Sequence, residues 1–118
     1  MKVVPAIEVE QKAVTMEGAS GARMRMLVGP QDGARNFHMR HFEVEPGGFT
    51  PHHKHDYEHE ILILKGQGVA QSEQGERRFA AGDVIWVPPN EMHQFRNTGA
   101  TPLEFICLIP APMQCCST

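Results

Sequence analysis

One stretch of the sequence reads His52-His53-Lys54-His55-Asp56-Tyr57-Glu58-His59 and holds four of the seven histidines of the chain. In a β-strand, residues two positions apart point to the same face, so the imidazoles of His53 and His55 can reach one point. His59 follows after a bend, and His93 begins another predicted strand further along. The imidazoles of His53, His55, His59 and His93 can therefore converge on a metal ion. We expect the other three, His38, His41 and His52, to be solvated or hydrogen-bonded histidines.

Short strands account for the rest of the chain. The 11 glycines and 9 prolines are spaced so closely that no window is long enough for a well-patterned amphipathic helix. Between them, β-branched and aromatic residues alternate with polar ones. The pattern predicts strands over residues 9–17, 24–28, 37–45, 59–65, 69–73, 76–79, 84–87, 93–97 and 103–109. Many short strands at this spacing are typical of a β-sandwich or a β-barrel.

Size and charge limit the classes of function. A chain of 118 residues and 13.2 kDa suits one domain, over residues 1–118. Its formal charge of −3 provides little attraction to phosphates, so we expect no nucleic-acid partner. The apolar runs are far shorter than the ~20 residues that cross a bilayer, and the first residues lack the pattern of a secretory signal. We therefore expect a cytoplasmic protein without membrane contact.

The cysteines agree with a reduced compartment. Their number is odd, and two of the three are neighbours in the sequence: Cys107, Cys115 and Cys116. Such a set does not encode the disulfide framework of a secreted domain. We expect residues 111–118 to form a loose tail.

Excess apolar sequence predicts self-association. The run Ile61-Leu62-Ile63-Leu64 is apolar on both faces of its strand, so both faces need cover. Residues 1–20 and the strand that holds Met24 and Met26 carry more apolar side chains than one small barrel is expected to hide. We predict a homodimer in which residues 1–20 provide a contact strand.

The histidine-rich stretch lies within a motif that resembles the first motif of the cupin superfamily. That motif, G-x5-H-x-H-x3–4-E-x6-G, is matched from Gly47 through His53 and His55 to Gly66. The resemblance covers about half of the chain once the second motif is included. It implies an all-β fold, namely a single-domain double-stranded β-helix, or jelly roll, that forms a cupin barrel.

The second cupin motif, G-x5-P-x-G-x2-H-x3-N, is matched from Gly82 through Pro88 and His93 to Asn97. It departs from the pattern at Asn90, which stands where the motif has glycine. Asparagine also tolerates a left-handed backbone conformation, so we expect the turn to be kept.

The glutamate position of the first motif has two candidates. Counting back from Gly66 reaches His59, whereas the longer spacing from His55 reaches Glu60. Periodicity leaves the choice open because both faces of this strand are apolar. The stretch from His55 to Ile61, together with residues 87–93 and 105–110, resembles the small single-domain manganese cupins that use four histidines. The resemblance implies as metal ligands His53, His55, His59 and His93.

A centre of four neutral imidazoles would leave the charge of a divalent ion uncompensated and two positions of an octahedral ion open. Imidazole suits several metals, so zinc, nickel and copper remain possible, while the resemblance implies Mn²⁺ first and Fe²⁺ second. Ligating histidines usually donate their other ring nitrogen to a carboxylate or a carbonyl. The carboxylates near enough in sequence to serve are Asp56, Glu58, Glu60 and Glu91.

The function that we expect first is a dioxygenase-like oxidoreductase that oxygenates or oxidatively cleaves a small organic substrate at a Mn or Fe centre. The alternatives are a non-redox isomerase, lyase or decarboxylase that uses the same metal as a Lewis acid, and a small-molecule binding module. Strand alternation places Phe105 and Cys107 in the substrate pocket if their face is the interior, and it places there either Arg40 or His41. The sequence assigns no catalytic residue and no substrate.

Overall fold

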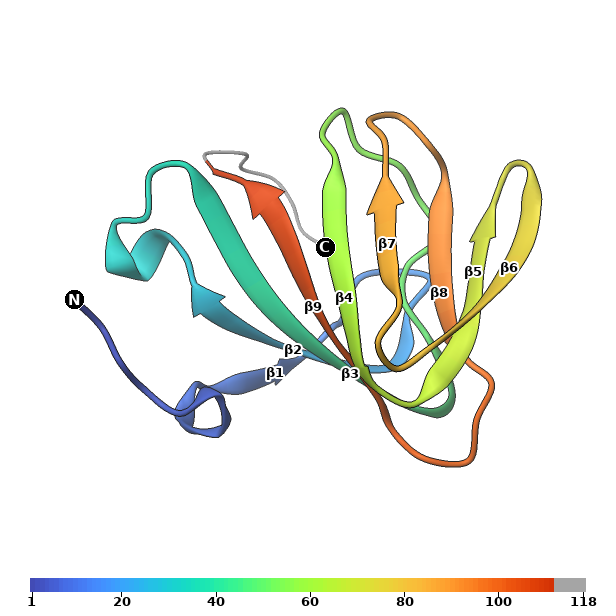
Figure 1. Cartoon of the computed structure of the whole chain (residues 1–118), viewed down its shortest axis with the longest axis horizontal. Coiled ribbons are helices and arrows are strands. Elements are labelled where there is room, and N and C mark those ends of the chain that lie inside the picture. The colour runs from blue at the N-terminus through green and yellow to red at the C-terminus, as the bar shows by residue number, and fades with distance from the viewer. Residues whose placement is uncertain (112–118) are drawn as a thin grey trace.

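Antiparallel strands form one curled sheet in the computed structural model of the chain, which describes residues 1–111 (Figure 1). The strands are β1 Gln11–Ala13, β2 Ser20–Val28, β3 Phe37–Phe49, β4 His59–Lys65, β5 Gln67–Ser72, β6 Gly75–Ala80, β7 Val84–Val87, β8 His93–Asn97 and β9 Leu103–Pro110. Two short 3-10 helices, η1 Ala6–Glu8 and η2 Pro30–Asp32, flank β1 and β2. The all-β jelly-roll prediction is confirmed.

The bounds of the strands agree best with the sequence pattern at β4, β7 and β8. The first predicted strand, over residues 9–17, forms only at Gln11–Ala13, where it pairs with β2. β3 is longer than predicted and continues through Pro46 to Phe49, because its far end pairs with Ser20 at the start of β2 and with Arg96 of β8. Of the predicted tail, Ala111 is buried, and residues 112–118, with Cys115 and Cys116, lie outside the described residues.

The strand order β6-β5-β8-β3-β9-β4-β7 explains how the sheet curls. The long β3 pairs with β9 along residues 37–44 and meets β8 only at Phe49, so one strand joins the two halves (Figure 1). β2 pairs with β3, and β1 pairs with β2. The edge strands β6 and β7 are therefore neighbours in sequence without being paired in the sheet.

The interior is lined by alternate residues of the strands. On β4, Ile61 and Ile63 are buried while Leu62 and Leu64 are exposed. Phe105 of β9 stacks on Phe42 of β3 with ring centroids 5.1 Å apart, and Phe95 of β8 packs edge-on against it at 5.8 Å. The two halves of the sheet thus share one apolar core.

Two turns of the motifs have the backbone that the sequence requires. Gly66, between β4 and β5, has φ +89°, and a Cβ there would lie 2.9 Å from the carbonyl oxygen of Pro102. Asn90 has φ 67°, which confirms that asparagine keeps the left-handed turn of the second motif. Asn97 ends this motif and is buried, with its amide donating to the carbonyl oxygens of Val44 and Thr101.

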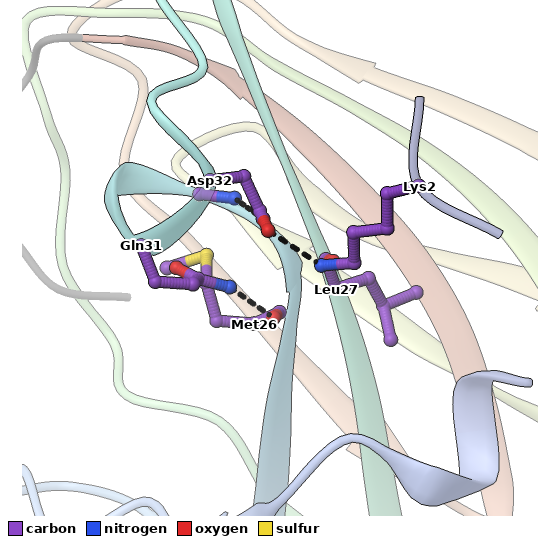
Figure 2. Close-up of polar contacts among 6 residues, drawn as sticks. Lys2, Met26, Leu27, Gln31 and Asp32 are labelled. Atoms are coloured by element: carbon purple, nitrogen blue, oxygen red, sulfur yellow. Dashed lines mark hydrogen bonds and ion pairs between the residues drawn. The ribbon is translucent and has the colours of Figure 1, made fainter. Parts of the chain in front are cut away.

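The N-terminal segment is attached to its own sheet. Figure 2 shows Lys2, whose Nζ lies 2.9 Å from the carbonyl oxygen of Leu27 and 2.8 Å from a carboxylate oxygen of Asp32. In the same turn, the side-chain amide of Gln31 donates to the carbonyl oxygen of Met26. These contacts hold the start of the chain against the end of β2.

Within the described residues, no helix is long and apolar enough to span a membrane.

Candidate metal centre

The four predicted histidines come from two strands and one loop. His59 begins β4 and His93 begins β8, while His53 and His55 lie in the loop between β3 and β4. His53 and His55 therefore do not owe their common direction to the alternation of a regular strand. Instead, His53 forms an isolated bridge with His93, in which the backbone N–H of each donates to the carbonyl of the other. The N–H of Asn90 donates to the carbonyl of His55 and holds the loop in place.

The structure brings these four imidazoles together. One ring nitrogen from each of His53, His55 and His93 lies within 4.8 Å of the others, and the Nε2 atoms of His53 and His55 are 3.1 Å apart. The ring of His59 completes the group, with centroid distances of 4.8 Å to His93 and 5.3 Å to His55. Such a cluster could hold a metal ion.

The orientation of β4 distinguishes His59 from Glu60. His59 is 3% exposed and points into the interior with Ile61, whereas Glu60 is exposed on the outer face. Periodicity left this choice open because both faces of the strand are apolar. In the fold, only the inner face is covered by the rest of the sheet, so the histidine and not the carboxylate faces the cluster.

The second ring nitrogens of His93 and His59 find partners that are not carboxylates. Nδ1 of His93 lies 2.9 Å from the carbonyl oxygen of Glu91, and donation to it leaves Nε2 free for a ligand. Nδ1 of His59 lies 3.4 Å from Sγ of Cys107. The four nearby carboxylates do not take this role: Asp56 and Glu60 are exposed, Glu58 accepts from the indole of Trp86, and Glu91 acts through its backbone.

Burial keeps the cluster neutral. It lowers the pKa of His59 to about 2, with further lowering by His93 and Arg40. It also lowers the pKa of His55 to about 4, and the pKa values of His53 and His93 shift in the same direction for the same main reason. Neutral imidazoles have free lone pairs, which metal coordination requires.

Two further observations fit a metal ion. Nε2 of His59 is buried and has no hydrogen-bond partner, which is costly for a polar atom unless a ligand binds there. The cavity between the imidazoles has a volume of about 20 Å³, enough for one water-sized group. His53, His55, His59 and His93 would therefore be able to hold a divalent ion between them.

These pKa values predict how the metal-free protein responds to acid. An unfolded histidine protonates near its ordinary pKa of 6.5, whereas folded His59 resists protonation until about pH 2. The unfolded state therefore binds more protons below pH 6.5, and the free energy of unfolding falls as the pH is lowered from 7 to 5. His59 alone should contribute about 2 kcal/mol to this loss. Urea unfolding of chelator-treated protein at both pH values measures it, and equal stabilities would contradict the prediction.

Three of the four predicted pocket residues line the same cavity. Arg40, Phe105 and Cys107 face it together with Phe42 and Phe95. The fourth, His41, does not: it lies on the opposite face of β3, where its Nε2 is 3.1 Å from a carboxylate oxygen of Glu104. Because alternate residues of a strand face opposite sides, placing Arg40 inward necessarily turns His41 away.

Sequence reasoning missed other residues of the site. Tyr57 is buried and stacks on His55 with centroids 4.7 Å apart and an interplanar angle of 14°. Thr50 and Pro51 precede the histidines and line the cavity from the loop. Phe95 follows His93 by two positions on β8, and this spacing was the one signal that could have placed it on the same face.

A larger cavity of about 540 Å³ adjoins the histidine cavity. It lies between the β5–β6 hairpin and β7. His93 and Phe95 line both cavities and so separate one from the other. The residues that line it are mixed: they include Phe79 and the two arginines Arg77 and Arg78, with further apolar and polar side chains. The gap between the unpaired edge strands therefore leaves room for a small organic molecule beside the cluster.

The fold and the histidine cluster agree with the comparison against known families. The Cupin domain family matches residues 40–109, and the chain belongs to this family. The matched region contains the four clustered histidines and the three cavity residues predicted from the sequence.

Individual relatives carry several different functions. The polyketide cyclase RemF from Streptomyces resistomycificus superposes with a TM-score of 0.91 at 32% sequence identity, over 98% of this chain and 82% of that one. A 1-methylthio-D-xylulose 5-phosphate methylsulfurylase of Rhodospirillum rubrum is 36% identical over 73 residues, which are 62% of this chain and 47% of that protein. An oxalate-binding protein of Thermotoga maritima is 40% identical over 68 residues, or 57% of this chain and 56% of that protein. The chain spans about half the length of these two curated relatives.

Proposed function

We propose that this cupin is a metal-dependent enzyme that uses a divalent ion, without redox change, to activate a carbonyl-rich small molecule, as in the cyclisation of a polyketide. The observation that carries the proposal is the similarity to the polyketide cyclase RemF, which extends over 98% of the chain with a TM-score of 0.91. This is the Lewis-acid alternative that the sequence also allows.

The residues of the site suit such a substrate. His53, His55, His59 and His93 would hold the metal, which when bound polarises a carbonyl oxygen and makes the adjacent C–H bonds more acidic. The rings of Phe42, Phe95 and Phe105 line the histidine cavity, and the buried Phe79 lines the larger one. The three rings keep water away from the histidines, and the larger cavity, which has both apolar and polar lining residues, leaves room for the substrate beside them.

We propose manganese as the native metal and iron as the second candidate, because the histidine pattern resembles that of the four-histidine manganese cupins. Metal analysis with EPR on protein purified without chelator or added metal tests this choice. About one manganese per chain is expected. Stoichiometric zinc, nickel or copper instead would make the choice of metal wrong and leave the Lewis-acid chemistry in place.

The competing function is the dioxygenase-like oxidation that the sequence predicts first. Four protein ligands would leave two positions of an octahedral ion open for dioxygen and substrate, and this favours the oxidation as well. A synthetic poly-β-keto thioester, incubated with zinc-loaded and manganese-loaded protein under argon and under oxygen, separates the two. Equal cyclisation under both gases and with both metals supports the cyclase proposal. Product that needs oxygen and manganese or iron would replace it with the oxidation, and no product with any metal would favour a binding module.

We also propose that the protein is a cytoplasmic homodimer. An apolar surface covers the outer face of β4 and β7, where Val84 is 75% and Trp86 59% exposed and Leu62 and Leu64 are exposed as well. Leu62 pairs with Val84 across the two strands, so their side chains are neighbours on this surface. Water-exposed apolar surface of this kind is typical of an interface.

Replacing Leu62 and Val84 together with lysine should convert the dimer into a monomer, because two charges would be buried at the contact. Size-exclusion chromatography with light scattering measures the mass. A second variant, Val3→Lys, tests the contact strand predicted in residues 1–20. A dimer that survives the double variant but dissociates in Val3→Lys would move the interface to the N-terminal segment. A monomeric wild-type protein would contradict the homodimer altogether.

A further inference from the structure

Arg40 is a buried cation without a counter-charge. It is 2% exposed and projects from β3 into the histidine cavity, where its guanidinium lies over the ring of Phe42 at 5.0 Å. Within residues 1–111, no carboxylate lies within ion-pair distance of it. Its Nε is buried and has no hydrogen-bond partner. The donors of this side chain are therefore only partly satisfied by the protein.

The neighbours of Arg40 do not supply the missing negative charge. Its Nη2 donates to Sγ of Cys107 at 3.1 Å and lies 3.5 Å from Nδ1 of His59. A thiol sulfur and an imidazole nitrogen are neither carboxylates nor oxygen acceptors, so these two contacts leave the guanidinium without the charged oxygen that it usually pairs with. A buried, unpaired charge is costly, and a divalent ion among the histidines would add more positive charge to the same cavity.

Other partly buried arginines of the chain find oxygen acceptors, even where one nitrogen stays unpaired, as Nε of Arg96 does. Arg96 forms an ion pair with Glu76 at 2.6 Å, and Arg25 donates to the backbone carbonyls of Ile7 and Val9. Both find oxygen acceptors within the protein. Arg40 has no oxygen acceptor among the described residues, although it is the most deeply placed of the three. The acceptor that it lacks can come from one oxygen atom of a ligand that reaches in from the adjoining larger cavity, because the histidine cavity itself has room for only about one water-sized group.

We propose that Arg40 binds an anionic oxygen of the substrate, so that the site selects a carboxylate or an enolate over a neutral ketone. The assignment deepens the proposed function, on which it rests: the carbonyl compound would be held in its enolate form or through an acid group. A guanidinium suits this task because its donors form a planar fork that matches two oxygens, and charge-assisted hydrogen bonds are about twice as strong as neutral ones.

The test compares anionic and neutral probes on zinc-loaded protein by isothermal titration calorimetry. Oxalate provides carboxylate oxygens, acetylacetone provides an enolate, and imidazole binds metal without an anionic oxygen. The variant Arg40→Met, which keeps the length of the side chain, is expected to weaken oxalate or acetylacetone binding by about 10- to 100-fold and to leave imidazole binding unchanged. If only oxalate binds the variant more weakly, the group that Arg40 binds is a carboxylate. If only acetylacetone does, that group is an enolate.

Controls separate this role from a structural one. Arg23→Met removes an exposed arginine of β2 and should change nothing. Arg40→Lys keeps the charge but loses the fork, so its anion affinities should fall between those of wild type and Arg40→Met. Equal anion affinities for wild type and Arg40→Met, at equal metal content, would overturn the proposal while the metal function stands.

The remaining outcomes also decide the question. If the wild-type protein holds no metal, the proposed function fails, and the same titration of metal-free wild type and Arg40→Met still tests Arg40. If Arg40→Met does not fold, a crystal structure of zinc-loaded wild type with oxalate takes its place. An oxalate oxygen within hydrogen-bond distance of the Arg40 guanidinium is expected, and oxalate bound without that contact would overturn the proposal.

Discussion

Replacing His59 with alanine is expected to lower the affinity for a divalent metal by at least about 100-fold, because loss of even an outer partner of a ligand costs 10- to 100-fold. The matched variant is Glu60→Ala at the next position, which should keep wild-type affinity. The reason lies in β4, where His59 is buried beside the other imidazoles and Glu60 is exposed on the outer face. Titration with Mn²⁺ or Zn²⁺, with metal content measured after dialysis, compares the two.

The pair of variants also tests the assignment made from the motif spacing. If Glu60→Ala loses the metal and His59→Ala keeps it, the longer spacing from His55 is the correct one and the ligand is a carboxylate. Circular dichroism of both variants checks that the fold is kept. This check matters most for His59→Ala, because Nε2 of His59 has no protein partner to lose but its Nδ1 contacts Sγ of Cys107.

Replacing Phe105 with alanine is expected to cost about 3–5 kcal/mol of the free energy of unfolding, which is a large part of the 5–15 kcal/mol typical of a domain. Phe105 is among the largest fully buried side chains and packs against Phe42 of β3 and Phe95 of β8. Its removal would leave a cavity where the two halves of the sheet meet. Urea unfolding of metal-free protein measures the change.

Phe37→Ala is the matched control, because Phe37 has the same side chain but is 72% exposed at the start of β3. It should change the free energy of unfolding by less than about 0.5 kcal/mol. A similar loss in both variants would mean that the aromatic contacts of Phe105 do not hold the two halves together. A larger loss at Phe37 would indicate that the outer surface is covered in solution.

Local sequence was sufficient for the pattern of strands. β4, β7 and β8 begin and end where alternation and turn residues predict, because these strands are bounded by strong turn signals such as Gly66, Gly82 and Asn90. The prediction failed where a strand depends on its partner. The segment over residues 9–17 forms only three residues of strand, and β3 extends beyond Pro46 because Ser20 and Arg96 pair with its far end. Pairing between residues that are distant in the sequence cannot be predicted from the local pattern of residues.

The motif spacing likewise identified which histidines belong together before their geometry was known. It did not identify their hydrogen-bond partners. Carboxylates near in sequence were expected, yet His93 meets the carbonyl of Glu91, and His59 meets the sulfur of Cys107 on a strand far along the chain. Partners of this kind depend on which strands lie side by side.

The sequence by itself determined the all-β class, the cupin motifs, the left-handed turn at Asn90 and the grouping of His53, His55 and His93. Period-2 alternation, turn chemistry and residue spacing are local properties, so a chain read in order reveals them. Only the tertiary structure decided that His59 and Arg40 face inward while Glu60 and His41 face outward. The inner and outer faces of β3 and β4 differ only in what covers them, and that cover comes from strands distant in the sequence.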